Sequence, residues 1–198
     1  MAEILCLGDS NTYGWDPASP LGQPYEKPWV TLLQERCGRE CRNLGMPGRR
    51  IPADEVSLRT LSALLKREAE TGTLLLMLGT NNCILPPCDG PERCAEKMEA
   101  LLRFLRREHR GLQPVLLGLP PLALRGENGG SDVRTVNRLY AALAERCSLP
   151  FYDPLPLNLP LAFDGVHLTE EGHRMLAEGL WKSGVWRAAA QGTENLYE

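Results

Sequence analysis

The chain has 198 residues, of which 43% are hydrophobic and 24% are charged, and its formal net charge is -3. This composition is typical of one globular domain with a sizeable core. The small negative charge gives no whole-chain electrostatic reason to bind nucleic acid or an anionic membrane, so we expect neither as a partner. The local basic run Arg103, Arg106 and Arg107 is interpreted as a solvated helix face.

Targeting signals and cysteine usage indicate the compartment. The first residues, MAEILCLGDS, lack the basic region and the long apolar run of a signal peptide, and no stretch approaches the roughly 20 apolar residues of a membrane span. The 7 cysteines are odd in number, and several lie in apolar patterns, which favours reduced thiols. We therefore expect a cytoplasmic protein.

The predicted elements alternate between strands and helices. In chain order they are a strand at residues 4–7, a helix at 29–36, a strand at 41–44, a helix at 53–70, a strand at 73–78, a helix at 92–108, a strand at 115–119, a helix at 131–147 capped by Ser131, a short strand at 151–152 and a helix at 169–186. This alternation predicts an α/β fold with a mainly parallel sheet.

The two ends of the chain differ in what they are expected to contribute. The final residues TENLYE resemble the remnant of an engineered protease site, so we expect residues 1–187 to form a single domain and residues 188–198 to be a tag remnant.

Long irregular segments follow the first, third and fourth strands, at residues 16–28, 84–91 and 125–130. In an open α/β sheet, ligands bind at the carboxyl ends of the strands, where these segments begin.

Ser10 is a candidate nucleophile because it follows the first strand directly, in the sequence GDSNT. Gly, Asp and Ser are also ordinary turn residues, so this tripeptide alone is compatible with a simple turn. A serine hydroxyl becomes a good nucleophile only when a base takes its proton, and that base is usually a histidine oriented by a carboxylate.

The sequence offers 3 histidines as that base. His109 ends a predicted helix, where we expect a surface histidine that favours the helix dipole. His173 lies inside the last helix and is expected to be structural. His167 differs because Asp164 precedes it by three residues across Gly165, so one turn can supply both the base and the carboxylate that orients it.

Donors for an oxyanion hole are expected at two other strand ends. Gly45 follows the second strand, where a backbone N–H without a side chain can approach a ligand closely. Gly79, Thr80 and Asn81 follow the third strand, so the Asn81 amide can donate into the same cleft.

These blocks together resemble the SGNH hydrolases, also called the GDSL family of esterases and lipases. The matching positions are Ser10 in GDSNT, Gly45 in NLGMPG, Asn81 in GTNN and His167 in DGVH, with Asp164 completing a triad. The resemblance implies a flavodoxin-like three-layer α/β/α sandwich with five strands, and ester hydrolysis through an acyl-enzyme on Ser10. It implies an oxyanion hole formed by the Ser10 and Gly45 N–H groups and the Asn81 side chain, without a cofactor.

The opening block GDSNTYGWDP looks most similar to the bacterial arylesterase and acyltransferase branch of this family. That resemblance implies a possible homo-oligomer and acyl transfer to alcohols in competition with water. Asn11 stands where the family name has leucine, and Asn82 stands where many relatives carry aspartate. The substrate pocket is expected to include Asp9, Asn11, Trp15, Asn82 and Val166.

Two alternatives from other classes explain fewer of these residues. Cys83, Cys88 and Cys94 could hold a metal, but their spacing is looser than that of zinc motifs and Cys94 lies on an apolar helix stripe, so no metal is expected. A ligand-binding flavodoxin-like module would leave Asp164 and His167 without a role. We therefore expect a small-molecule ester with a short acyl chain as substrate, with acetylated carbohydrates, lysophospholipids or thioesters as alternatives.

Overall fold

A five-stranded parallel sheet forms the centre of the protein, as seen in a computed structural model that describes residues 3–123 and 129–187. The strand order is β2-β1-β3-β4-β5, and each pairing of neighbouring strands is parallel. The strands are β1 (Glu3–Gly8), β2 (Cys41–Gly45), β3 (Gly72–Met77), β4 (Leu112–Leu117) and β5 (Phe151–Tyr152). The expected α/β fold class is therefore confirmed.

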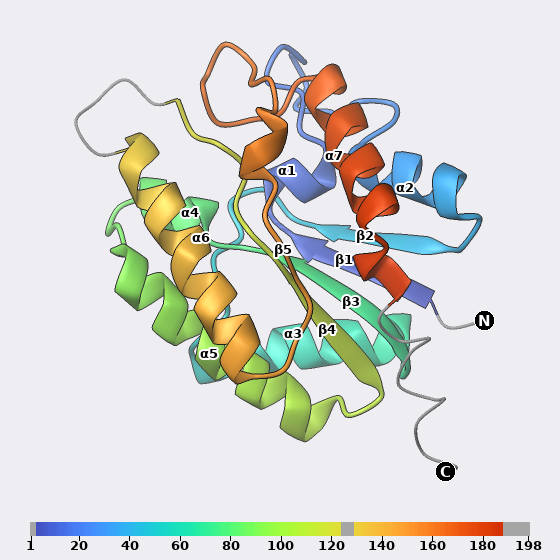
Figure 1. Cartoon of the computed structure of the whole chain (residues 1–198), viewed down its shortest axis with the longest axis vertical. Helices are drawn as coiled ribbons and strands as arrows, with labels where there is room; N and C mark the ends of the chain where they lie inside the picture. The colour runs from blue at the N-terminus through green and yellow to red at the C-terminus, as the bar shows by residue number, and fades with distance from the viewer. Residues whose placement is uncertain (1–2, 124–128, 188–198) are drawn as a thin grey trace.

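Helices cover both faces of the sheet (Figure 1). On one face lie α3 (Glu55–Glu68), α5 (Pro91–Glu108) and α6 (Gly129–Arg146), and on the other lie α2 (Trp29–Cys37) and α7 (Glu170–Ser183). Two short helices, α1 (Ser10–Tyr13) and α4 (Thr80–Ile84), lie at the carboxyl ends of β1 and β3, and 3-10 turns span Leu155–Leu157 and Val185–Arg187. The three-layer α/β/α arrangement matches the expectation.

The two faces of the sheet bury separate apolar cores. Along β1, Leu5 and Leu7 pack toward α3, α5 and α6, whereas Ile4 and Cys6 pack toward α2 and α7. This alternation follows from the period of two in a strand. Every residue of β3 is buried because the strand is central and covered on both faces.

Several predicted boundaries were wrong by a few residues. β4 begins at Leu112, three residues earlier than expected, because Gln113 and Pro114 interrupt the apolar pattern within the strand. The last helix ends at Ser183, since Gly184 adopts a φ of 72° and stops it. The helix expected from Ser131 begins at Gly129 instead.

The expectation of an exposed His109 was also wrong. His109 caps the end of α5 but is only 8% exposed, and its Nε2 lies 3.0 Å from the Ser62 hydroxyl of α3. Burial lowers the pKa of His109, followed by the effect of the nearby Lys66 charge. The ring therefore joins two helices rather than standing in solvent as a cation.

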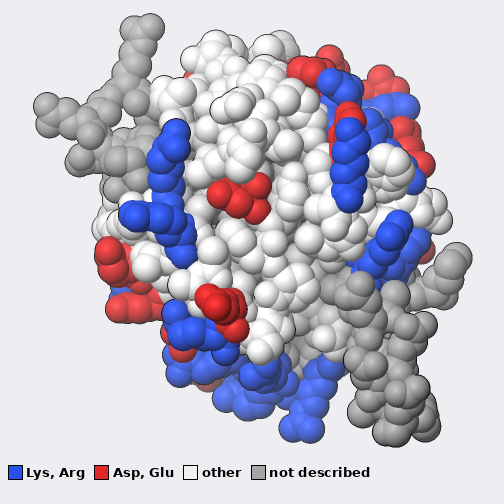
Figure 2. All heavy atoms as spheres, in the orientation of Figure 1, with Lys and Arg blue, Asp and Glu red and all other residues white. Residues whose placement is uncertain are grey.

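The molecular surface agrees with the expected solvated face of α5. The Arg103 and Arg107 side chains are 73% and 72% exposed. Figure 2 shows lysine and arginine side chains gathering along the lower margin of the displayed face, where Figure 1 places α3 and α5. Within the described part of the chain, no helix is long and apolar enough to cross a membrane. The proposed tag remnant at 188–198 lies outside the described residues.

Candidate active site

Ser10 lies at the first position of α1, immediately beyond the carboxyl end of β1. Asp9 forms the turn between them, since its Oδ1 accepts the Asn11 N–H at 3.0 Å and its carbonyl accepts the N–H groups of Thr12 and Tyr13. Ser10 is 7% exposed. The Ser10 backbone N–H has no hydrogen-bond partner among residues 3–123 and 129–187.

His167 lies between Ser10 and Asp164. Its Nε2 is 2.9 Å from the Ser10 Oγ, and its Nδ1 is 2.5 Å from the Asp164 Oδ2. A proton on Nδ1 would be donated to the carboxylate, which leaves Nε2 to accept the serine hydroxyl. The structure therefore brings together three side chains that are up to 157 residues apart in the sequence.

The turn at residues 164–167 is stabilised by its own carboxylate. The Asp164 Oδ1 accepts the N–H groups of Val166 and His167, both at 3.0 Å, and Gly165 allows the turn with a φ of 71°. Burial raises the pKa of Asp164, but the hydrogen bonds from His167 and Val166 outweigh it, and the net pKa is lowered. Asp164 is therefore an anion that can orient the imidazole.

Asn11 fastens the histidine loop to α1. Its Nδ2 donates to the Val166 carbonyl at 3.1 Å, and its Oδ1 accepts the Leu168 N–H at 2.9 Å. These two peptide groups lie on either side of His167. The sequence predicts a pocket residue at position 11. In the structure, the oxygen and the nitrogen of the buried Asn11 amide both hold the loop that carries His167.

Gly45 does not offer its N–H to the cleft. That N–H donates to the Asn43 Oδ1 at 2.9 Å, and a Cβ added at Gly45 would lie 2.1 Å from the Tyr13 N. Glycine at this position allows β2 to approach α1. Gly48, which the sequence did not single out, lies three residues later with a φ of 76°, and a Cβ added there would have no atom within 4 Å. Its N–H has no partner within the described residues.

Asn81 and Asn82 lie in the first turn of α4, and both contact the segment at residues 49–51. The Asn81 Nδ2 donates to the Arg49 carbonyl at 3.0 Å, and the Asn82 Oδ1 accepts the Ile51 N–H at 2.9 Å. One Asn81 amide proton remains for a ligand, because a side-chain amide has two. The α4 asparagines therefore fix the position of residues 49–51, which directly follow Gly48.

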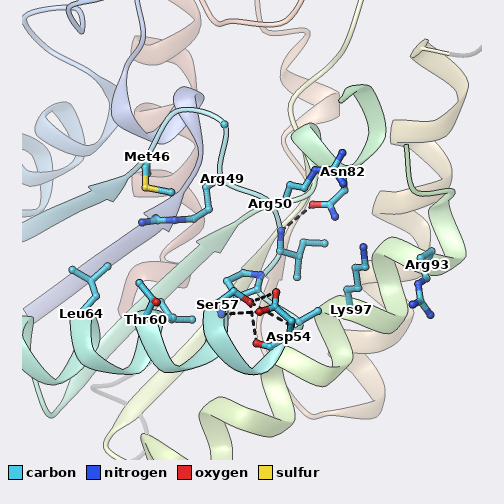
Figure 3. Close-up of a pocket in the computed structure, with 15 residues that line it drawn as sticks. Met46, Arg49, Arg50, Asp54, Ser57, Thr60, Leu64, Asn82, Arg93 and Lys97 are labelled. Carbon is cyan, nitrogen blue, oxygen red and sulfur yellow. Dashed lines mark hydrogen bonds between the residues drawn. The ribbon is translucent and has the colours of Figure 1, made fainter. Parts of the chain in front are cut away.

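A cavity of about 710 Å³ lies beside this segment (Figure 3). Gly48, Asn82 and residues of α3 and α5 line it, but neither Ser10 nor His167 does. Asn82, which was expected to line the substrate pocket, therefore lines this cavity and not a pocket at Ser10.

The remaining expected pocket residues lie close to the triad. The Trp15 ring centroid is 6.2 Å from that of His167. Asp9 is almost completely buried, and this desolvation raises its pKa to about 6 against the hydrogen bonds from Asn11 and Thr80. The Val166 backbone joins Asp164 to Asn11.

His173 is buried in α7 and makes no hydrogen bond to a triad residue within the described part of the chain. Its Nδ1 accepts the Trp29 N–H at 3.3 Å, and burial lowers its pKa to about 4, so it is neutral. Among the described residues, no group of three or more His, Cys, Asp or Glu side chains is suited to a metal, and no disulfide joins the cysteines. Cys83 and Cys94 do meet, with sulfurs 3.9 Å apart.

A comparison of the sequence with known protein families identifies the class of enzyme. The sequence profile of the GDSL-like Lipase/Acylhydrolase family matches residues 6–175. The chain belongs to this family. It is therefore an esterase or acylhydrolase of the GDSL type, a carboxylic ester hydrolase, as the four blocks implied.

Solved structures of family members share the fold. The Mycobacterium smegmatis (M. smegmatis) aryl esterase has a TM-score of 0.79 and 24% identity over 93% of this chain and 98% of its own. Est24, a carbohydrate acetylesterase from Sinorhizobium meliloti, has a TM-score of 0.78 and 23% identity over the same shares. A putative arylesterase from Agrobacterium tumefaciens has a TM-score of 0.79 and 23% identity, again over 93% and 98%. A comparison with curated proteins finds no significant match.

Proposed function

We propose that this GDSL-family hydrolase cleaves small carboxylic esters through an acyl-enzyme on Ser10. One observation carries the proposal: His167 is within hydrogen-bond distance of both the Ser10 hydroxyl and the Asp164 carboxylate, on opposite ring nitrogens. This is the arrangement in which a base removes the serine proton while a carboxylate stabilises the resulting imidazolium.

The chemistry proceeds in two half-reactions. The Ser10 Oγ attacks the acyl carbonyl while its proton moves to the His167 Nε2, and the tetrahedral intermediate collapses when His167 gives that proton to the leaving alcohol. Water then gives a proton to His167 and attacks the acyl group, and the acid leaves as Ser10 regains its proton. Asp164 remains ionised and keeps the Nδ1 proton in place throughout.

The proposed oxyanion donors are the Ser10 N–H, the Gly48 N–H and the Asn81 amide. The Ser10 and Gly48 N–H groups are supported by their lack of a partner among the described residues, and Asn81 by its free amide proton. Gly48 replaces Gly45 in this proposal because the Gly45 N–H is bonded to Asn43. Loss of one such donor typically costs about 10²- to 10³-fold in kcat.

The substrate class is proposed from the site and the neighbours. Trp15 lies beside His167, which protonates the leaving group, so it is placed to contact an aryl or alkyl alcohol. An aromatic wall there would also favour an attacking alcohol over water, which supports acyl transfer as a second outcome. The names of the structural neighbours, an aryl esterase and a carbohydrate acetylesterase, support short acyl groups.

The test measures hydrolysis of p-nitrophenyl acetate and butyrate by the wild type and by Ser10→Ala, His167→Ala and Asp164→Asn variants. Ser148→Ala is the control, because Ser148 is exposed in the turn between α6 and β5, far from the carboxyl ends of the strands. We expect loss of turnover in the three triad variants and wild-type turnover in the control. Turnover by Ser10→Ala at the wild-type rate, or fluorophosphonate labelling of another residue, would overturn the mechanism.

A substrate panel separates the candidates. Acetylated sugars, short aryl esters, lysophospholipids and acyl thioesters would be compared by kcat/KM, and ester formation from added alcohols would be followed in parallel. A preference for acetylated sugars would assign a carbohydrate acetylesterase instead of an aryl or alkyl esterase.

A further inference from the structure

The oxygen and the nitrogen of the Asn82 side-chain amide both make hydrogen bonds. The residue is completely buried, its Oδ1 accepts the Ile51 N–H at 2.9 Å, and its Nδ2 donates to the Asp89 Oδ2 at 2.6 Å. Figure 3 shows the side chain directed toward the segment at residues 49–51, with the bond to the residue 51 N–H dashed. One side chain thus joins the loop between β2 and α3 to the loop between α4 and α5.

Asp89 accounts for the presence of an amide at position 82. The Asp89 Oδ2 accepts both the Asn82 Nδ2 and the Lys97 Nζ, the latter at 2.5 Å, and its backbone N–H donates to the Asn82 carbonyl at 2.7 Å. The Asp89 side chain is 13% exposed. A carboxylate at position 82 would face another carboxylate here, whereas an amide supplies the donor that Asp89 requires.

Hydrogen bonds and nearby positive charges keep Asp89 ionised. Burial raises the pKa of Asp89, but the hydrogen bonds from Asn82 and Lys97 and the nearby positive charges of Lys97 and Arg50 outweigh it, and the net pKa is lowered. Asp89 is therefore ionised and acts only as an acceptor. The amide of Asn82 then has one possible orientation, with its NH₂ group toward Asp89 and its oxygen toward Ile51.

The same segment is bonded to α4 and its following loop at two further points. The Asn81 Nδ2 donates to the Arg49 carbonyl, and the Arg50 guanidinium donates to the carbonyls of Leu85 and Pro87, the latter at 3.0 Å. Gly48 directly precedes these residues. The position of the Gly48 N–H relative to Asn81 is thus set by the contacts of residues 49–51.

We propose that Asn82, Asp89 and Lys97 form a positioning unit that holds the Gly48 N–H and the Asn81 amide in register as oxyanion donors. The unit rests on the proposed function of that site and adds three positioning residues to it. None of the three needs to touch the substrate. Their effect is on the placement of donors, so they should act on kcat more than on KM.

The first test exchanges the two partners. Asn82→Asp should lower kcat for p-nitrophenyl acetate by about 10- to 100-fold, with KM within about threefold, because a displacement near 1 Å can cost 10²-fold. The double variant Asn82→Asp with Asp89→Asn restores a donor opposite an acceptor and should recover at least about fivefold of that loss. Wild-type kcat in the single variant, or no recovery in the double variant, would overturn the proposal.

A second test is milder and remains informative where Asn82→Asp folds poorly. Lys97→Met should lower kcat by about three- to tenfold, and Lys97→Arg should restore most of it because the cation is kept. Arg103→Met, on the exposed face of the same helix, is the matched control and should keep the wild-type kcat. Equal kcat in Lys97→Met and Arg103→Met would contradict the unit.

The two proposals fail in different ways. A wild-type protein without esterase activity, or with activity that survives Ser10→Ala, removes the proposed function. Activity that depends on Ser10 but is unchanged in Asn82→Asp and Lys97→Met leaves the function intact and removes only the positioning unit. Circular dichroism of each variant would confirm that kcat is compared between folded proteins.

Discussion

Asp9 is almost completely buried beside Ser10, and its neutral form is favoured in the folded protein. Burial raises its pKa from 3.8 to about 6. A carboxyl whose pKa is raised on folding stabilises the protein most below pH 3.8, and this contribution is lost as the pH rises through about 6. The difference of about two pKa units corresponds to about 3 kcal/mol.

Asp9→Asn should therefore gain stability relative to the wild type as the pH rises. Asparagine keeps the oxygen that accepts the Asn11 N–H and does not ionise. The unfolding free energy of the variant minus that of the wild type, measured with urea between pH 4 and pH 7.5, should increase by up to about 3 kcal/mol. Asp54→Asn is the control, because hydrogen bonds from Ser57 lower the pKa of Asp54 from 3.8. Its titration therefore lies at the acid end of this range or below it, and the corresponding difference should hardly change between pH 4 and pH 7.5. A difference for Asp9→Asn that does not change with pH would contradict this account.

The residue scale also shows where sequence patterns stop being informative. Asp164 and His167 were predictable because three residues and a glycine suffice for a carboxylate to reach an imidazole. His109 was not, because its burial depends on Ser62 of α3, 47 residues away. Gly45 and Gly48 were indistinguishable in sequence, and only the side chain of Asn43 and the backbone of Tyr13 show that Gly45 serves packing.

At the scale of elements, α1 carries Ser10 and also holds the loop of its base. Asn11→Ala removes both hydrogen bonds to the peptide groups that flank His167. We expect kcat to fall by about 10- to 100-fold with little change in KM, because the imidazole loses its fixed distance to Ser10. Asn11→Asp keeps the acceptor for the Leu168 N–H but turns a carboxylate oxygen toward the Val166 carbonyl, so it should not recover the wild-type kcat. An unchanged kcat in Asn11→Ala would show that the turn of Asp164 positions His167 alone.

The contact between α1 and the end of β2 depends on Gly45. A Cβ there would lie 2.1 Å from the Tyr13 N, and a backbone atom cannot rotate away as a side chain can. Gly45→Ala should lower the unfolding free energy by about 1–3 kcal/mol and reduce esterase activity, because α1 must shift with Ser10 on it. Gly38→Ala is the control, since φ is 66° there but no atom lies within 4 Å. It should cost stability through backbone strain and leave the activity unchanged.

Most of the strands and the long helices were predictable from apolar runs or from an apolar helical period, whereas α1 and α4 were not. Both are too short for a helical period to appear, at 4 and 5 residues, and each begins next to a strand-end glycine, after Gly8-Asp9 and after Gly79. These two short helices carry Ser10, Asn81 and Asn82. The apolar pattern that predicts the sheet and the long helices therefore does not predict the short helices of the site. Their positions depend on hydrogen bonds to loops that are distant in the sequence.

At the scale of the whole molecule, one sheet joins two apolar cores that do not otherwise meet. Within the described residues, no tryptophan packs in the core of α3, α5 and α6: Trp29 and Trp186 pack in the core of α2 and α7, Trp181 lies in α7, and Trp15 lies at the active site beside His167. Leu65 of α3 is completely buried in the opposite core. Tryptophan fluorescence therefore reports on the layer that does not contain Leu65.

Leu65→Ala tests whether residues 1–187 unfold as the single domain that the sequence predicts. Removing the buried side chain should cost about 2–5 kcal/mol. Because β3 is covered by both cores, loss of packing on one face should destabilise the other face equally, so urea transitions followed by far-ultraviolet circular dichroism and by tryptophan fluorescence should shift together. Leu33→Ala, in the core of α2 and α7, should give the same coincidence. A fluorescence midpoint unchanged in Leu65→Ala while the dichroism midpoint falls would mean that the two layers unfold independently.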